Sequence, residues 1–134
     1  MIDIENELFN HMSTLLHERY DPILVANEYA LSPAIFPSVT IEEKNNTPLT
    51  RTQDSGSLEN HVTLLYAINV YSNKKSGRKQ ECKMIFNTLD NEFQRLGFTR
   101  TLRESIPNLA DATIYRLIGR YTAVVSKDKI IYRG

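Results

Sequence analysis

The amino-acid sequence predicts an α+β fold, in which two α-helices pack on an antiparallel β-sheet that includes a hairpin with a long loop. Two segments carry apolar residues at spacings of three and four, which is the period of a helix buried along one side. Residues 61–72 alternate in polarity, as a half-buried strand does. With 134 residues, the chain is expected to form a single domain, 1–134.

The two helices are expected near the N-terminus and over about residues 76–96. The first should end near Tyr20, because a proline two residues later restricts the backbone before it, and Gly97 is placed for a left-handed cap on the second. The stripes are Ile4, Leu8, Phe9, Met12, Leu15 and Leu16 in the first helix, and Cys82, Ile85, Phe86, Leu89, Phe93 and Leu96 in the second. The single cysteine, Cys82, is therefore expected to be buried and unreactive.

Strands are expected on both sides of a polar stretch, residues 45–59. The strand before it covers residues 39–44 and the strand after it covers 61–72, so the two predict an antiparallel hairpin with a mobile loop. Loops of this length are usually functional or disordered. Further strands are expected at residues 23–26, 98–106, 113–126 and 129–132. In the strand at 98–106, regular alternation places Arg100, Leu102 and Glu104 on one face.

Composition argues against a nucleic-acid coat protein and against a membrane protein. Lys plus Arg equals Asp plus Glu at 16 each, so the formal net charge is zero, whereas proteins that coat nucleic acid carry a basic excess. No segment approaches the ~20 apolar residues of a membrane span, and the acidic N-terminus is unlike a secretory signal. We expect no membrane partner and a protein that stays in the cytoplasm where it is made.

The residue types that carry catalysis or bind metals do not form a recognisable pattern. His11 and His17 are six residues apart on the first helix, so they point to opposite sides, and His61 has no nearby cysteine or carboxylate pair. Glu42 and Glu43 are adjacent in a strand and therefore face opposite ways. No glycine-rich phosphate loop is present. We expect a structural or binding subunit that is not an enzyme and has no cofactor.

A basic run precedes the second helix and comprises Lys74, Lys75, Arg78 and Lys79. Positive charge at a helix N-terminus opposes the helix dipole. The run therefore indicates either a solvated turn or a surface that binds an acidic partner or phosphate.

The strand at 113–126 carries a second unusual pattern. Its one face is apolar, while the other alternates aliphatic side chains with Arg116 and Arg120 around Ile118. Arginine beside aliphatic residues is favoured at protein interfaces. The alternative is two surface arginines whose stems cover a partly exposed isoleucine.

The end of the chain resembles the tail terminator (tail completion) family of long-tailed bacteriophages. The resemblance is carried by the run Ile114-Tyr115-Arg116-Leu117-Ile118-Gly119-Arg120-Tyr121-Thr122-Ala123-Val124-Val125, closing on Ile130-Ile131-Tyr132-Arg133, and by the order of the expected elements. It implies a homohexameric ring on the head-proximal end of the tail tube. This ring stops tube polymerisation and meets the head-side connector or stopper protein.

The same resemblance implies where the protein works and what it touches. Its partners would be itself, the tail tube protein and the head-side connector, and DNA would only pass through the channel. It would occupy the host cytoplasm during assembly and then the virion neck. The arginine-bearing strand, the basic run, and Leu49 and Arg51 of the polar loop are the interface hypotheses.

Two other functions are also compatible with the sequence. One is another phage neck protein, a head–tail adaptor or stopper. The other is a small nucleic-acid-binding α+β domain that uses the basic run, which predicts salt-sensitive binding to DNA or RNA.

Overall fold

The computed structural model describes residues 1–28, 35–49, 60–106 and 111–132. Its elements are α1 (Glu5–Arg19), β1 (Leu24–Ala26), β2 (Ser38–Pro48), β3 (His61–Ser72), α2 (Arg78–Leu96), β4 (Thr99–Ser105), β5 (Tyr115–Ser126) and β6 (Ile131–Tyr132). Within these residues the strands form one mostly antiparallel sheet in the order β1-β2-β3-β5-β4, with β6 paired to β5. The predicted α+β class is confirmed.

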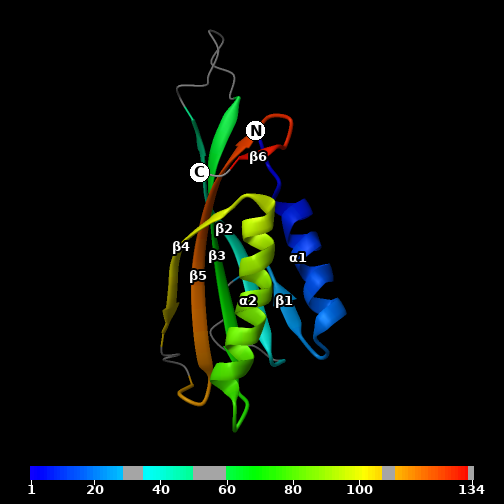
Figure 1. The fold of residues 1–134 in the computed structure, drawn as a ribbon, viewed down its shortest axis with the longest axis vertical. Coiled ribbons are helices and arrows are strands. Elements are labelled where there is room, and N and C mark those ends of the chain that lie inside the picture. The colour runs from blue at the N-terminus through cyan, green and yellow to red at the C-terminus, as the bar shows by residue number, and fades with distance from the viewer. Residues whose placement is uncertain (29–34, 50–59, 107–110, 133–134) are drawn as a thin grey trace.

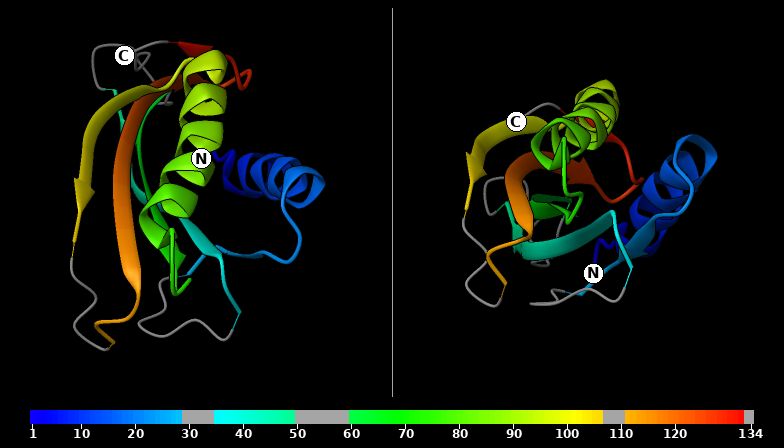
Figure 2. Two further views of the ribbon diagram at one scale, coloured as in Figure 1. Left: turned by 60° about the horizontal axis from the view of Figure 1, so that its bottom comes forward. Right: turned by 90° about the horizontal axis from the view of Figure 1, so that it is seen from below.

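The two helices lie on the same face of the sheet, with α2 over the centre and α1 beside it (Figures 1 and 2). The predicted apolar stripes explain this arrangement. Leu8, Met12 and Leu16 of α1 are buried, and α2 buries Cys82, Ile85, Phe86, Leu89 and Phe93 against β3 and β5. Burial also raises the pKa of the Cys82 thiol to about 12, so this cysteine stays protonated, as expected for an unreactive thiol.

An aromatic group holds α2 on the sheet. The ring of Phe93 stacks on Tyr121 of β5 with centroids 4.4 Å apart, and Phe98 packs edge-on against Phe93 at 5.2 Å. Gly119 of β5 leaves room for the ring of Phe86, since a Cβ at that glycine would lie 2.7 Å from the ring carbons. The helix can therefore approach the sheet this closely only because Gly119 has no side chain.

The hairpin differs from its prediction. Strand β2 does not end at residue 44 but continues through Pro48, and its last residues pair with β3 from Asn45↔Leu65 to Pro48↔Val62. A bulge at Lys44 shifts the register. These residues are polar on both sides and therefore lack the alternation that marks a half-buried strand, although backbone pairing needs no apolar side chain. The rest of the expected loop, 50–59, lies outside the described residues.

Four further boundaries or pairings also differ. β1 pairs with β2 in parallel, so the sheet is not wholly antiparallel. Helix α2 begins at Arg78, after Gly77 in the left-handed conformation, and not at residue 76. The last strands are shorter than expected, because β5 begins at Tyr115 and β6 covers only Ile131–Tyr132.

Strand β4 contains a bulge that corrects the predicted face of Arg100. The register shifts between Arg100 and Leu102, so Arg100 turns to the helix side and pairs with Asp90 at 3.1 Å. Leu102 and Glu104 remain on the opposite face, where they neighbour Arg120 and Ile118 of β5. The extra residue breaks the period of two on which the prediction relied.

Candidate interface

The sheet face opposite the helices carries no described helix or strand (Figure 2). Its central residues are nevertheless buried, with Thr40, Asn69 and Tyr71 each at most 5% exposed. On β5, Leu117, Tyr121 and their alternate neighbours point into the core, so Arg116, Ile118 and Arg120 share this other face. We call it the open face. The alternation predicted for this strand is therefore correct, and the structure brings these three residues together on one surface.

The register of the strands fills in the rest of the open face. Glu42 of β2, Ala67 of β3 and Arg120 of β5 are cross-strand neighbours in one row. The next row holds Thr40, Asn69 and Ile118. Because Ala67 is small, the face is hollowed there into a depression of about 280 Å³, lined by Glu42, Lys44, Ala67, Ile68, Asn69, Arg116, Ile118, Gly119 and Arg120.

The two arginines of the open face have different environments. Arg116 is held in place, because its Nε donates a hydrogen bond to Oδ1 of Asn69 at 3.0 Å and its guanidinium lies 5.8 Å from the centre of the Tyr71 ring. Arg120 is exposed. A fixed cation and an exposed one on the two sides of Ile118 give the face both a preordered and an adaptable contact for a partner.

Glu42 is the acidic counterpart on the same face. Its Oε2 accepts a hydrogen bond from Lys44 Nζ at 3.2 Å. Its Oε1 is buried and has no hydrogen-bond partner in the described part of the chain. A buried carboxylate oxygen without a donor is costly, and because this atom is buried, a partner molecule would not reach it unless the side chain turned outward.

The basic run forms the turn between β3 and α2. Lys74 Nζ lies 3.8 Å from Oε2 of Glu81, and Arg78 donates to the Lys74 carbonyl at 3.5 Å. Lys75 and Lys79 are exposed. Part of the positive charge is therefore neutralised within the chain, and the turn is less basic than the sequence suggests.

The remaining interface hypotheses are not brought to the open face. The backbone N–H of Leu49 donates to the carbonyl of His61 at 2.9 Å, so Leu49 lies at the start of β3, while the basic turn follows its end. The 12 residues of β3 separate the two by roughly 40 Å. Arg51 lies outside the described residues. The predicted site residues thus occupy separate regions, and only the β5 group forms one surface with a depression.

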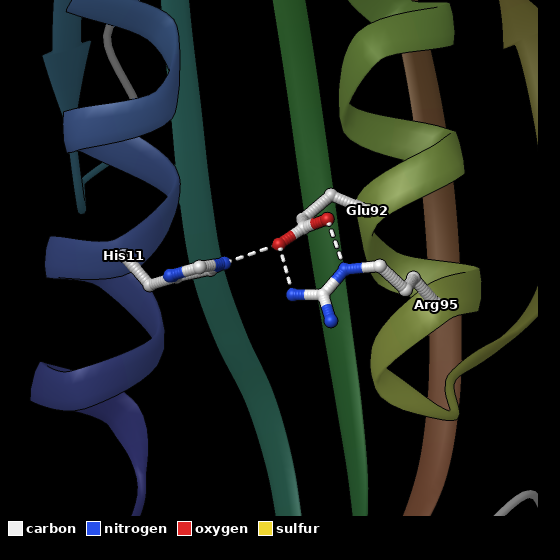
Figure 3. Close-up of polar contacts among 3 residues, drawn as sticks. All are labelled: His11, Glu92 and Arg95. Carbon is white, nitrogen blue, oxygen red and sulfur yellow. Dashed lines mark hydrogen bonds and ion pairs between the residues drawn. The ribbon is translucent and has the colours of Figure 1, made fainter.

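Two polar groups that sequence reasoning missed lie on the helix side. His11 of α1 and Arg95 of α2 both contact the carboxylate of Glu92, which joins the helices (Figure 3). Asp90 is buried and accepts hydrogen bonds from the Tyr121 hydroxyl at 2.6 Å and from Arg100. The sequence does contain a signal for the Asp90 group, because Asp90 falls four residues after Phe86 and thus within the apolar stripe of the helix.

Other features that would indicate a specific chemistry do not appear in residues 1–28, 35–49, 60–106 and 111–132. No three His, Cys, Asp or Glu side chains among them are grouped so as to hold a metal ion. None of the helices there combines the length and the apolar character that a membrane span requires.

Comparison with models of known protein families and with curated proteins gives no match. Functional inference therefore depends on the open face itself and on the resemblance carried by the residues of β5.

Proposed function

We propose that this chain is a structural, non-enzymatic subunit of a phage tail terminator ring, which caps the head-proximal end of the tail tube and joins it to the head connector. The observation that carries the proposal is the open face, with Arg116, Ile118 and Arg120 around a depression. A sheet face that combines arginine with aliphatic side chains suits contact with another protein. A contact between two different surfaces of one chain closes into a ring when its rotation allows.

The layout of the molecule supports the same proposal. The chain runs from a short helix through a long hairpin and a five-turn helix to closing strands, which is the order that the resemblance implies. The described part of the β2–β3 hairpin reaches beyond the helix layer (Figure 1). An extended hairpin at one end of a subunit suits contact with a second component, such as the tube protein.

The first experiment measures native mass across a concentration series, by light scattering or mass photometry, and then incubates the protein with purified tail tubes. We expect a hexamer, either free or on the tube ends, and tubes that no longer elongate. Replacing Arg116 and Arg120 with Ala should weaken the ring. A protein that neither forms a ring nor stops tube elongation would contradict the proposal.

The alternative phage neck proteins, a head–tail adaptor or a stopper, would also be structural subunits, but they would bind a different partner. A head–tail adaptor or stopper would bind connector components and leave tube elongation unchanged. The elongation assay therefore separates them from a terminator.

A further inference from the structure

Strands β1 and β4 lie at the two ends of the strand order, and within the described residues each is paired on one side only. An unpaired edge presents backbone N–H and C=O groups to which another extended strand can bind. The successive pairings from β1 to β4 make these two edge strands run in opposite directions. Two copies placed side by side in one continuous sheet would therefore meet as antiparallel strands.

Alternate residues of β4 direct their backbone groups away from the sheet. The N–H of Ile106, just after β4, donates to the carbonyl of Arg116 on β5 at 3.1 Å. Bonded pairs alternate along an antiparallel ladder, so Glu104 also bonds to β5, while the backbone groups of Arg103 and Ser105 point outward. These two residues are the ones to which a neighbouring strand could bond.

Strand β1 has an outward residue of the same kind. The N–H of Leu24 donates to the carbonyl of Pro37 at 3.0 Å, so Leu24 and Ala26 bond to β2, and the backbone groups of Val25 point outward. Val25 lies opposite Val39, which is buried in the core, so its side chain is on the helix side of the sheet.

The side chains of the two edges lie on matching faces. Arg103 lies opposite Gly119 on the helix side, and its guanidinium is 5.4 Å from the centre of the Phe86 ring. Residues that are opposite each other in a sheet carry their side chains on one face. Val25 can therefore bond to Arg103 or Ser105 of another copy while the helix layers of both copies stay on the same side.

The helix layer leaves room for such a neighbour. α2 lies over the centre of the sheet and α1 beside it on the β1 side, while no described helix lies over β4 (Figures 1 and 2). A partner whose β1 pairs with β4 would bring its own α1 over β4. Residues 1–21, which include α1, contain five Asp or Glu residues and one Arg. The exposed Arg100 and Arg103 on the helix side of β4 complement this charge.

We propose that neighbouring copies join edge to edge, with β4 of one subunit paired to β1 of the partner subunit and the partner's α1 lying over β4. The inference rests on the proposed function and identifies the contact that repeats around its ring. Each copy uses two different edges, so the contact closes into a ring when its rotation allows. Arg116 and Arg120 of β5 are one strand, or about 4.8 Å, from this edge, so their long side chains border the contact.

Charge disfavours the competing contact, in which β4 pairs with β4 of a second copy. A symmetric antiparallel pair that uses both outward residues sets Arg103 opposite Ser105 of the partner subunit. Glu104 then lies opposite Glu104 of the partner subunit, and like charges directly opposite each other destabilise a strand pair. The residues of β1 are uncharged, so pairing with β1 brings no such repulsion.

Proline at position 105 tests the strand pairing. Ser105→Pro removes an N–H that points outward and places a ring at the edge, so it should block the neighbour while the bonds to β5 remain. Ser105→Ala keeps the N–H and is the matched control. In sedimentation velocity across a concentration series, the wild type and Ser105→Ala should associate, and Ser105→Pro should associate at least tenfold more weakly. Circular dichroism checks that each variant is folded.

Charge reversal tests the same contact without a proline. Arg103→Glu should weaken association, and so should Glu18→Arg combined with Asp21→Arg at the exposed end of α1 that leads into β1. An equimolar mixture of these two variants should associate again in alternating order. Each reversed β4 then meets a reversed α1, and each native β4 meets a native α1. Lys75→Glu, in the turn before α2, makes the same charge change as Arg103→Glu away from both edges and should leave association unchanged.

Three results would overturn the contact: a wild type that stays monomeric up to about 1 mM, a folded Ser105→Pro that associates as the wild type does, or a mixture that fails to associate. The tube elongation assay is independent of these results. If the wild type stops elongation but Ser105→Pro associates normally, this inference fails and the proposed function stands. If copies join through these edges but never stop elongation, the proposed function fails and the contact stands.

Discussion

At the scale of single residues, the carboxylate of Glu92 is a main link between the two helices. Arg95 donates two hydrogen bonds of 2.7 Å to it from the same helix, and His11 approaches from α1 (Figure 3). The hydrogen bonds from Arg95, aided by His11, hold the pKa of Glu92 at about 2, below its ordinary 4.5. A carboxyl group with a depressed pKa stabilises the fold above its unfolded-state pKa, and this stabilisation is lost as the pH falls through the folded-state value.

Glu92→Gln should therefore lower the free energy of unfolding at pH 7 by roughly 1 kcal/mol or less, because the pair is near the surface. The difference from wild type should shrink between about pH 4.5 and pH 2. Urea unfolding at pH 7, 4 and 2.5 measures it. Glu18→Gln, on an exposed position of α1, is the control, and a difference that does not change with pH would contradict the assigned role of the carboxylate.

At the scale of elements, the contact of α2 with β5 sets how closely the helix layer approaches the sheet. The ring of Phe86 lies directly over Gly119, with Ile68 of β3 beside it. On the opposite side of the same strand lie the arginines of the open face. Any shift of β5 that makes room for a side chain at this glycine is therefore transmitted to the candidate interface.

Gly119→Ala should destabilise the protein by about 1–3 kcal/mol, because the added methyl group overlaps the Phe86 ring. Urea or thermal unfolding measures the loss. Phe86→Leu in the same chain should recover part of it by freeing space, so the double variant is less destabilised than the sum of the single variants. Additive effects would show that the two residues do not share this space.

At the scale of the whole molecule, the charge distribution favours protein partners over nucleic acid. The formal net charge is zero, and Lys74 of the basic turn is close to Glu81. The exposed cations that remain in the turn include Lys75 and Lys79. Nucleic-acid affinity grows with the number of phosphates that a protein neutralises, so this turn offers little of it.

We expect no binding to duplex or single-stranded DNA at physiological salt in a gel-shift or fluorescence anisotropy assay. Any binding at low salt should fall steeply as salt is added, and Lys75→Gln with Lys79→Gln should remove it. Lys127→Gln, at the other end of β3, serves as the control. Tight binding that persists at physiological salt and depends on the turn would favour the nucleic-acid alternative over the tail terminator.

Local patterns in the sequence determined the helices, the main hairpin, the burial of Cys82 and the two faces of β5. Each of these follows from a period of 3.6 or 2 within one segment, and neighbouring side chains along the chain are enough to reveal it. The helix stripes and the Arg116–Ile118–Arg120 pattern were recovered for this reason. Strand residues 45–48 were not, because they have no buried face to impose a period.

Only the tertiary structure decided which residues lie side by side across strands. The parallel pairing of β1, the bulges at Lys44 and Thr101, and the row that joins Glu42 to Arg120 all depend on register between segments distant in sequence. Register is set by the whole packed sheet and its bulges, and a shift of one residue would turn each side chain to the other face. The sequence by itself thus determined which strand carries the arginines of the candidate interface. The packed sheet determined that Glu42 lies in the same cross-strand row as Arg120.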